Sequence, residues 1–295
     1  MTYFSCNFYG KYKKSLILKV EKVSAFAYEN RGGNPAGVLI LDETLSEKQM
    51  LEIAKEINYS ETAFLLKQGN SFRIRYFSPE TEIVFCGHAT IASGFVLGQK
   101  FGLGMYDLVL NDDKIQIEVT KNNNKIFTSI NSVKTYTYEI EEDYINNIIG
   151  AFSFTRNDLN EKYPIKVSFS GINNLILFVK NKNTLQEMKY DFEEVKELMI
   201  NKNIVTINIL WEENKNLFHS RNAFAYGGVY EDPATGSAAI SLGEYLRSMG
   251  IKKSGEIEIL QGFDMKQPSQ LFVSFNEVPN SSIKVSGTCR FVNAK

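Results

Sequence analysis

The feature that most constrains the fold of this 295-residue chain is a pair of related segments, residues 85–94 and 232–243. When they are superposed on their glycine turns, identical residues coincide in the pairs Gly87/Gly236, Ala89/Ala238, Ile91/Ile240, Gly94/Gly243 and Leu97/Leu246. In each segment a glycine turn flanked by polar side chains leads directly into a helix of small and apolar residues. Two such turns facing each other would form one pocket from two related halves. The repeat therefore predicts an enzyme with a pseudo-twofold site.

Composition excludes several other classes of protein. The hydrophobic fraction of 43% and the charged fraction of 23% are ordinary for a soluble globular protein. A formal net charge of −1 provides no field that would attract nucleic acid or an anionic membrane, so neither is expected as a partner. We find no apolar run of the roughly 20 residues that a membrane span needs, and the N-terminus lacks the apolar core of a signal peptide.

The cysteines and histidines predict a protein without a metal. Cys6, Cys86 and Cys289 cannot all pair with one another and lack the spacing of metal ligands, and the only imidazoles belong to His88 and His219. We therefore expect a reduced, cytoplasmic protein with no metal site.

Local patterns predict a mixture of strands and helices. Ser46 and Gln49 form a capping box, which together with helical spacing of apolar residues predicts a helix over 46–57. Further helices are expected over 88–97, 191–199 and 237–247, the first and last buried on every side, and 191–199 is the one helix expected between residues 121 and 215. Strands are expected over 16–26, 36–41, 61–67, 72–76, 174–180, 205–211, 256–260, 271–275 and 283–292, with a hairpin over 107–120 that turns at 111–113.

This order of elements is an α+β pattern and not the regular alternation of a Rossmann or TIM fold. We expect an N-terminal domain over residues 1–130, in which residues 1–15 are a loose extension, and a C-terminal domain over 131–295. The last strand is expected to return and pair with the N-terminal half.

Five blocks in register resemble the PhzF-like (phenazine biosynthesis-like) family of the diaminopimelate epimerase-like superfamily. They cover nearly the whole chain from residue 18. The blocks are Gly33-Asn34-Pro35-Ala36, Ser60-Glu61-Thr62-Ala63-Phe64, Phe77-Ser78-Pro79 with Phe85-Cys86-Gly87-His88-Ala89-Thr90, Glu231-Asp232-Pro233-Ala234-Thr235-Gly236-Ser237-Ala238-Ala239, and the weaker Gln261-Gly262 with Pro268-Ser269.

The resemblance implies two similar domains, each a barrel-like sheet around a central helix, with the active site in the cleft between them. It also implies a cofactor-free isomerase or epimerase that moves a proton on carbon of a small carboxylate substrate, and a homodimer. One departure is Lys266-Gln267, where the family usually has Gly-Arg. If that arginine contacts substrate in relatives, the substrate here differs.

Glu61 is the candidate catalytic acid/base, because the family's glutamate falls on it. A carboxylate at the start of an apolar strand can be poised at the rim of an apolar cavity, where it accepts a proton and returns it. Two interpretations of Glu61 are open. Composition alone favours an ordinary solvated glutamate, whereas its position within the family's motifs favours a catalytic one.

Three further polar residues match the family's active site. His88 follows a glycine turn and is either a packing residue or a partner of the substrate that titrates in the useful pH range. Asp232 is either a turn residue before proline or a group that orients the substrate. Ser237 is either a helix cap or a substrate contact.

The glycine turns are expected to hold the substrate carboxylate. Backbone N–H groups at a helix N-terminus lack partners and carry the positive end of the helix dipole, which suits an anion. This assigns Gly87, Thr235 and Gly236 to binding. Asn34 is equally a turn residue or an additional polar contact.

Cys86 separates two enzyme hypotheses. Related racemases use one cysteine from each domain, and Cys86 occupies the first position, but residues 234–237 contain no cysteine. We therefore expect Cys86 to be a small packed residue and Glu61 to carry the proton. The alternatives are a cysteine-assisted amino-acid racemase or epimerase, and a non-catalytic member that only binds its ligand.

Overall fold

The computed structural model describes residues 2–7 and 15–292. The chain divides into two compact units, Met1–Ile130 with Gly287–Lys295, and Asn131–Ser286. Within the described residues, no helix is both long and apolar enough to cross a bilayer.

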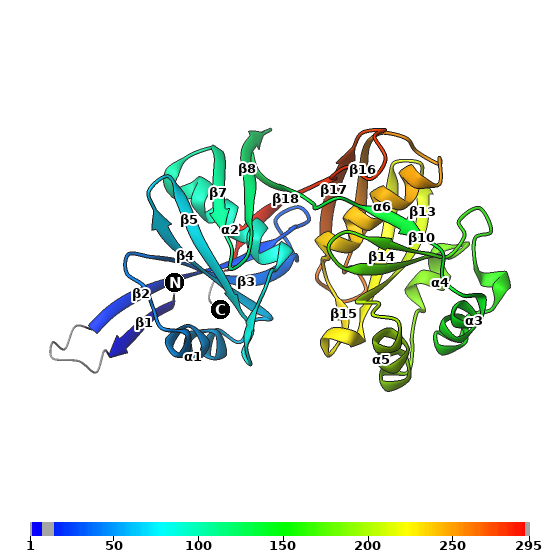
Figure 1. Cartoon of the computed structure of the whole chain (residues 1–295), viewed down its shortest axis with the longest axis horizontal. Helices are drawn as coiled ribbons and strands as arrows, with labels where there is room; N and C mark the ends of the chain where they lie inside the picture. The colour runs from blue at the N-terminus through cyan, green and yellow to red at the C-terminus, as the bar shows by residue number, and fades with distance from the viewer. Residues whose placement is uncertain (1, 8–14, 293–295) are drawn as a thin grey trace. The chain divides into compact units, whose positions relative to one another are not determined.

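The first unit is a closed barrel around one helix. Its pairings run β2–β3–β4–β5–β7–β8–β9–β18 and back to β2, which closes a barrel of 8 strands. The barrel strands are β2 Ser15–Ala25, β3 Asn34–Leu41, β4 Glu61–Gln68, β5 Ser71–Phe77, β7 Gly104–Val109, β8 Lys114–Asn122, β9 Lys125–Asn131 and β18 Lys284–Phe291. Two further strands of this unit, β1 Thr2–Asn7 and β6 Glu82–Ile83, are not part of the closed ring. Helix α2 (Gly87–Phe101) contacts β2, β3, β4 and β8 and is buried from residue 88 to residue 98, whereas α1 (Glu47–Ile57) is amphipathic (Figure 1).

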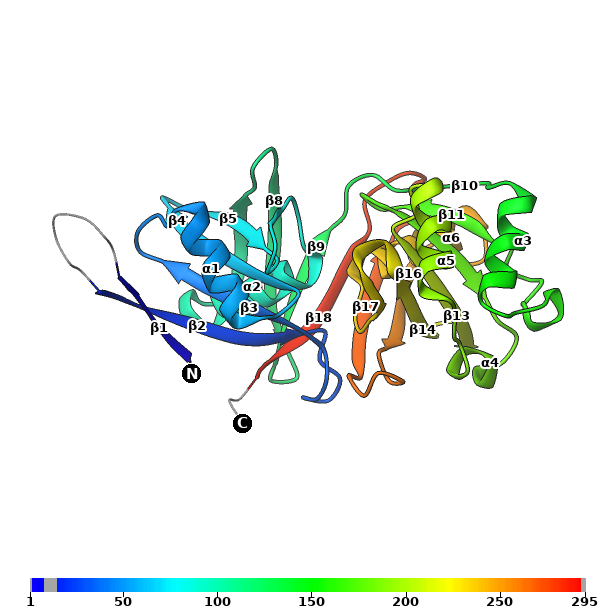
Figure 2. The same cartoon turned by 90° about the horizontal axis from the view of Figure 1, so that it is seen from below.

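The second unit also folds around one central helix, α6, and has additional helices. Its strands are β10 Tyr136–Tyr138, β11 Lys166–Phe169, β12 Asn173–Phe178, β13 Thr206–Asn214, β14 Leu217–Phe224, β15 Val229–Asp232, β16 Gly255–Gln261 and β17 Ser269–Phe275, followed by the first part of β18. Its helices are α3 Glu142–Ala151, α4 Lys182–Gln186, α5 Phe192–Asn201 and α6 Gly236–Ser248, with short 3₁₀ turns at Arg156–Asp158 and Ala225–Gly227. Helix α6 contacts β10, β11, β12 and β17 (Figure 2).

The two units share one order of strand pairing. In the first unit β2–β3 is antiparallel, β3–β4 parallel, β4–β5 antiparallel, β5–β7 parallel and β7–β8 antiparallel. The series β11–β12, β12–β13, β13–β14, β14–β16 and β16–β17 follows the same sequence of directions. Because α2 precedes β7 as α6 precedes β16, the internal repeat of the sequence is a repeat of the fold.

Glycines allow each central helix to lie close to its sheet. A Cβ atom on Gly94 would be 2.4 Å from Thr128 Cγ2, and one on Gly98 would be 2.5 Å from Val119 Cγ1. The corresponding distance from Gly243 to Val273 Cγ1 is 3.0 Å. The small residues that predicted buried helices are therefore required by the closeness of the sheet.

Most of the expected elements are present. The capping box at α1 is confirmed: Gln49 N donates to Ser46 Oγ (3.3 Å), and Ser46 N donates to Gln49 Oε1 (2.9 Å). Both buried helices are confirmed, although α2 continues to Phe101. The hairpin over 107–120 corresponds to β7 and β8, and the last strand pairs with β2 at Cys289↔Ala25.

Two expectations about the architecture were wrong. Within residues 1–15, Thr2–Asn7 form strand β1, which pairs antiparallel with β2, while residues 8–14 lie outside the described residues. Between residues 121 and 215, α3 and α4 accompany the single helix that was expected. The apolar residues of α3 are spaced as on one helix face, with Tyr144, Ile145 and Ile148 buried, but they stand among the asparagines that had indicated turns.

Candidate functional site

Glu61 stands at the first position of β4, where strand register and a preceding turn fix it. It pairs with Ala36 of the parallel strand β3. Helix α1 ends at Asn58, whose left-handed φ of 54° directs the chain into β4. The Glu61 side chain is only 20% exposed, and its Oε2 atom is buried with no hydrogen-bond partner among the described residues. A carboxylate oxygen in this state is available to a ligand or to a proton.

His88 brings an imidazole to that oxygen. It is the second residue of α2, and its Nε2 lies 3.3 Å from Glu61 Oε2, a distance that makes an ion pair when the ring is protonated. The side chain is 10% exposed. Two residues that the sequence proposed separately for the site are therefore neighbours within one unit.

Cys86 completes a cluster with these two residues. Its Sγ lies 3.3 Å from His88 Nδ1 and 3.9 Å from Nε2, and the ligand atoms of Glu61, Cys86 and His88 all lie within 4.8 Å of one another. Cys86 is buried, as expected, but it packs against the imidazole. The sequence signal was the motif Cys-Gly-His itself, which places both side chains at the start of one helix.

A hydrogen-bonded chain holds this helix start in place. Thr90 Oγ1 donates to the Cys86 carbonyl at 2.6 Å and lies 2.7 Å from the Tyr76 hydroxyl. Tyr76 is fully buried, and this burial raises the pKa of its phenol well above the ordinary value. The phenol therefore stays neutral and keeps its hydrogen bond to Thr90.

The N-termini of α2 and α6 both lack a side-chain cap. Cys86 and Thr235 are their N-cap residues, and neither side chain caps its helix. A Cβ atom on Gly87 would meet nothing within 4 Å in the described structure, so the backbone there borders open space. This is the local arrangement in which helix N–H groups bind an anion.

Asn34 is held by the strained turn before it. It begins β3, pairs with Ala25 of β2 and is 3% exposed. Gly33 has φ +83°, and a Cβ atom there would be 2.5 Å from the Ala25 carbonyl oxygen, so the turn requires glycine. Asn34 lies two positions before Ala36, the partner of Glu61, and so at the same end of the paired strands.

The candidates of the second unit form a hydrogen-bonded group. Thr235 Oγ1 donates to Asp232 Oδ2, at the end of β15. Gln261 Nε2 donates to Thr235 Oγ1 (3.0 Å) and to the Asp232 carbonyl (2.7 Å). Asn222 Nδ2 also donates to Thr235 Oγ1, at 2.9 Å. Sequence reasoning missed Asn222, which stands in no motif, and treated Gln261 only as part of a weak block.

Gly236 and Ser237 start α6 next to this group. Gly236 is buried, and the partly buried Ser237 accepts a hydrogen bond from Ser170 Oγ at its carbonyl oxygen, at 2.9 Å. The structure thus places Asp232, Thr235, Gly236 and Ser237 together in the second unit. It likewise places Glu61 and His88 together in the first unit.

The Lys266-Gln267 departure lies in the turn that follows Gln261. Gln267 N donates to the Gly262 carbonyl at 2.9 Å, and a Cβ atom on Gly262 would be 2.7 Å from the Pro233 carbonyl oxygen. The turn therefore packs directly against the residue after Asp232. The Lys266-Gln267 departure therefore changes the surroundings of the Asp232 group.

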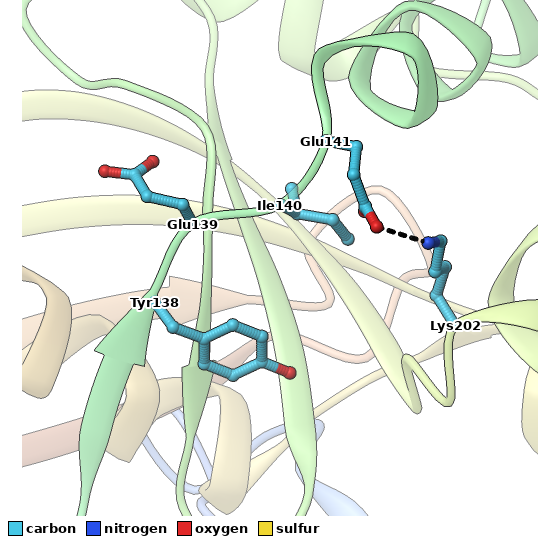
Figure 3. Close-up of a pocket in the computed structure, with 5 residues that line it drawn as sticks. All are labelled: Tyr138, Glu139, Ile140, Glu141 and Lys202. Carbon is cyan, nitrogen blue, oxygen red and sulfur yellow. Dashed lines mark hydrogen bonds and ion pairs between the residues drawn. The ribbon is translucent and has the colours of Figure 1, made fainter.

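Two surface hollows lie apart from these residues. One, of about 500 Å³, is lined by Tyr138, Glu139, Ile140, Glu141 and Lys202. Figure 3 shows the Lys202 side chain meeting Glu141, with Nζ 2.7 Å from Oε1. The other, of about 650 Å³ in the first unit, includes Phe95, Lys121 and Cys289. Neither is lined by a residue that the sequence proposed for the site.

Comparison with known proteins agrees with this architecture. The family model described as "Phenazine biosynthesis-like protein" matches residues 23–294. The uncharacterized isomerase YfhB of Bacillus subtilis is 26% identical over 284 residues, covering 94% of this chain and 95% of the relative. The uncharacterized isomerase YddE of Escherichia coli is 31% identical over 235 residues, covering 77% and 78% respectively.

Solved structures show the same fold. The PhzF-family protein of Bacillus anthracis superposes with a TM-score of 0.83 at 24% identity, covering 93% of this chain and 96% of that one. A probable proline racemase of Agrobacterium radiobacter superposes with a TM-score of 0.61 at 8% identity, covering 93% and 91%. The family model and the relatives together show that this chain belongs to the phenazine biosynthesis-like (PhzC-PhzF) family.

Proposed function

We propose that this protein is a PhzF-like isomerase that moves a proton on carbon of a small carboxylate substrate by cofactor-free acid/base catalysis. Relatives named as isomerases support the reaction class. The observation that carries the mechanism is Glu61, whose buried Oε2 has no hydrogen-bond partner within the described chain and lies 3.3 Å from His88 Nε2.

In this mechanism Glu61 accepts a proton from a substrate carbon next to the carboxylate or conjugated with it. The C–H electron pair moves into the conjugated carboxylate. The proton on Glu61 exchanges with solvent while the intermediate is bound, and Glu61 then protonates another position or face. His88 donates a hydrogen bond to the Glu61 carboxylate or to the substrate. The open N–H groups at the start of α2 stabilise the charge that develops on the substrate oxygen.

We assign substrate binding to Asn34, His88, Gly87 and the second-unit group of Asp232, Thr235, Gly236 and Ser237. Support for the second group comes from its rigidity. Because Gln261 holds both Thr235 and the Asp232 carbonyl, the Asp232 carboxylate keeps one orientation. A carboxylate fixed in this way is suited to a substrate amine or hydroxyl.

The test is exchange of a carbon-bound proton with solvent. Wild type, Glu61→Gln and Glu256→Gln are incubated in D₂O with a panel of small amino and hydroxy acids, and deuterium uptake is followed by NMR. Glu256 is an exposed glutamate near the start of β16 and serves as the matched control. We expect exchange in wild type and in the control and its loss in Glu61→Gln.

If Glu61→Gln exchanges as fast as wild type, Glu61 is not the base. A wild type that is thermally stabilised by a carboxylate ligand but exchanges no proton would instead be a binding protein.

A second candidate is a cysteine-assisted racemase or epimerase, which the 3.3 Å contact between Cys86 Sγ and His88 Nδ1 favours. An imidazole beside a thiol promotes the thiolate that would act as a base. Cys289 is a poor substitute, because desolvation raises the pKa of its thiol. Unchanged exchange in Cys86→Ser and after thiol alkylation would remove this candidate.

A further inference from the structure

We propose that Glu61, Cys86 and His88 form a binding site for a divalent transition-metal ion, with Zn²⁺ as the best match, and that the bound ion inhibits the enzyme. The three side chains offer a carboxylate oxygen, a sulfur and an imidazole nitrogen within 4.8 Å of one another. These three side chains form the one such group of potential ligands among the described residues. Binding of the ion does not depend on the proposed function, whereas inhibition does.

The spacing fits tetrahedral zinc. Bonds of about 2.3 Å to sulfur and about 2.0–2.2 Å to nitrogen and oxygen place tetrahedral ligand atoms about 3.3–3.6 Å apart. His88 Nε2 lies 3.3 Å from Glu61 Oε2 and 3.9 Å from Cys86 Sγ. Because the Glu61 carboxylate oxygen and Cys86 Sγ lie within 4.8 Å of each other, a rotation of the Cys86 side chain that moves the sulfur by up to about an ångström brings the three atoms to tetrahedral spacing.

The donor set selects the class of ion. A thiolate and an imidazole favour zinc and similar borderline-soft ions, whereas Mg²⁺ and Ca²⁺ prefer sites made only of oxygen. Three protein ligands leave the fourth position of a tetrahedral ion to water or to a substrate atom. The carboxylate oxygen that lacks a hydrogen-bond partner gains one strong interaction when the ion binds.

The site is held in place before the ion arrives. Cys86 and His88 flank Gly87 at the start of α2, and Thr90 holds the Cys86 carbonyl at 2.6 Å. The helix itself cannot move toward the sheet, because Gly94 already lies against Thr128. Open space beside Gly87 gives the ion a route of entry.

Inhibition follows from the identity of the first ligand. A carboxylate bound to zinc no longer accepts a proton from carbon, so the ion competes directly with the proposed reaction. Zinc binding also requires the thiol to lose its proton, so each ion bound releases protons and affinity rises with pH.

Binding is measured on the full-length protein after metal has been removed with a chelator. Zn²⁺ is titrated in competition with a chromogenic chelator, and Co²⁺ is titrated as an optical probe whose near-ultraviolet band reports a thiolate ligand. We expect one ion per chain, an affinity at least about tenfold weaker in Cys86→Ser and in His88→Gln, and no cobalt–thiolate band in Cys86→Ser. Circular dichroism confirms that each variant is folded.

The matched controls are His219→Gln, Cys289→Ser and Cys6→Ser. His219 also pairs with a carboxylate, Glu213 Oε2 at 2.6 Å, but lies in the second unit. All three controls should bind zinc as wild type does. Absence of stoichiometric binding in wild type, or binding that Cys86→Ser and His88→Gln both leave unchanged, overturns the site.

Activity separates the two parts of the proposal. If zinc binds at the site and proton exchange continues at the metal-free rate, the inhibitory role is wrong. If no substrate exchanges under any condition, the proposed isomerase fails while the binding measurements still decide the metal site.

Discussion

The N-termini of α2 and α6 occupy equivalent places in the repeated fold, but the side chains around them differ. At α2 the N-cap residue is a thiol beside an imidazole, and the nearby Glu61 retains an oxygen with no hydrogen-bond partner among the described residues. At α6 the N-cap residue is Thr235, whose hydroxyl donates to Asp232 and accepts from Gln261. The repeat preserves a helix N-terminus without a side-chain cap. Its two copies differ in whether their side chains remain available to react.

The difference indicates a division of labour between the units. A carboxylate that accepts a hydrogen bond from a threonine hydroxyl, as at Asp232, is fixed in direction. Glu61, whose Oε2 has no hydrogen-bond partner among the described residues, is the carboxylate to which we assign the proton transfer. We therefore expect changes at α2 to alter rate and changes at α6 to alter affinity and stability.

The sharpest test compares Glu61→Gln with Asp232→Asn. General acid/base catalysis contributes about 10²–10⁴-fold, so we expect kcat to fall by about that factor in Glu61→Gln. Asp232→Asn keeps the shape of the group and should mainly raise KM. Steady-state kinetics on a substrate found by deuterium exchange separates the two parameters. A loss of kcat in Asp232→Asn as large as in Glu61→Gln would end the proposed division.

The next effect concerns the stability of the α6 end. Thr235→Val removes the hydroxyl that Gln261 and Asn222 bond, leaving two buried amides with fewer partners. We expect a loss of about 3 kcal/mol in the free energy of unfolding, measured by urea denaturation. Thr235→Ser keeps the hydroxyl and serves as the matched variant. A loss in Thr235→Ser larger than the loss in Thr235→Val would show that packing of the methyl group, and not hydrogen bonding, dominates.

A smaller change in stability is expected when the equivalent glycines of the two central helices are replaced by alanine. In Gly94→Ala the new methyl lies 2.4 Å from Thr128 Cγ2, and overpacking of this kind costs about 1–3 kcal/mol. In Gly243→Ala the nearest atom is 3.0 Å away, and a helix-propensity gain of about 1 kcal/mol offsets the contact. Thermal unfolding of both variants tests the comparison. A more destabilised Gly243→Ala would show that the second helix is the tighter one.

The smallest effect is a pH dependence confined to the surface of the first unit. Arg75 donates two hydrogen bonds to Glu82, which lower the pKa of that carboxyl below its ordinary value. The pair therefore stabilises the fold above the ordinary carboxyl pKa, and this contribution is lost as the pH falls through the lowered value. We expect Glu82→Gln to be less stable near neutrality by under about 1 kcal/mol.

The difference between wild type and Glu82→Gln should shrink on acidification, as urea titrations at several pH values would show. The exposed Glu52→Gln on α1 is the control. A difference that stays constant with pH would mean that the pair contributes through packing alone.

Local sequence determined much of this molecule. The capping box of α1 and the small residues of α2 and α6 depend on interactions within one segment, and all three helices were predicted. The contact between Glu61 and His88 was not predicted, because it depends on the register of β4 against β3 and on the position of α2 inside the barrel.

Spacing rules for metal ligands likewise do not detect the cluster of Glu61, Cys86 and His88. They count along the chain, whereas Glu61 belongs to β4 and Cys86 and His88 to the start of α2. For the same reason Asn222, which reaches Thr235 from β14, carried no local signal. The homodimer has no local signal either and stays a prediction.

One consequence of β18 concerns the order in which the protein is made. Its first part pairs with β17 at Lys284↔Ser274, and its last part pairs with β2 at Phe291↔Val23 (Figure 2). On the ribosome, all residues of the second unit leave the exit tunnel before that last part does. Domains usually fold in the order of their synthesis. Here the unit that begins first is completed last. Until then residues 23–25 of β2 lack their β18 partner and form a short open edge on which an early chaperone or a neighbouring nascent chain can pair.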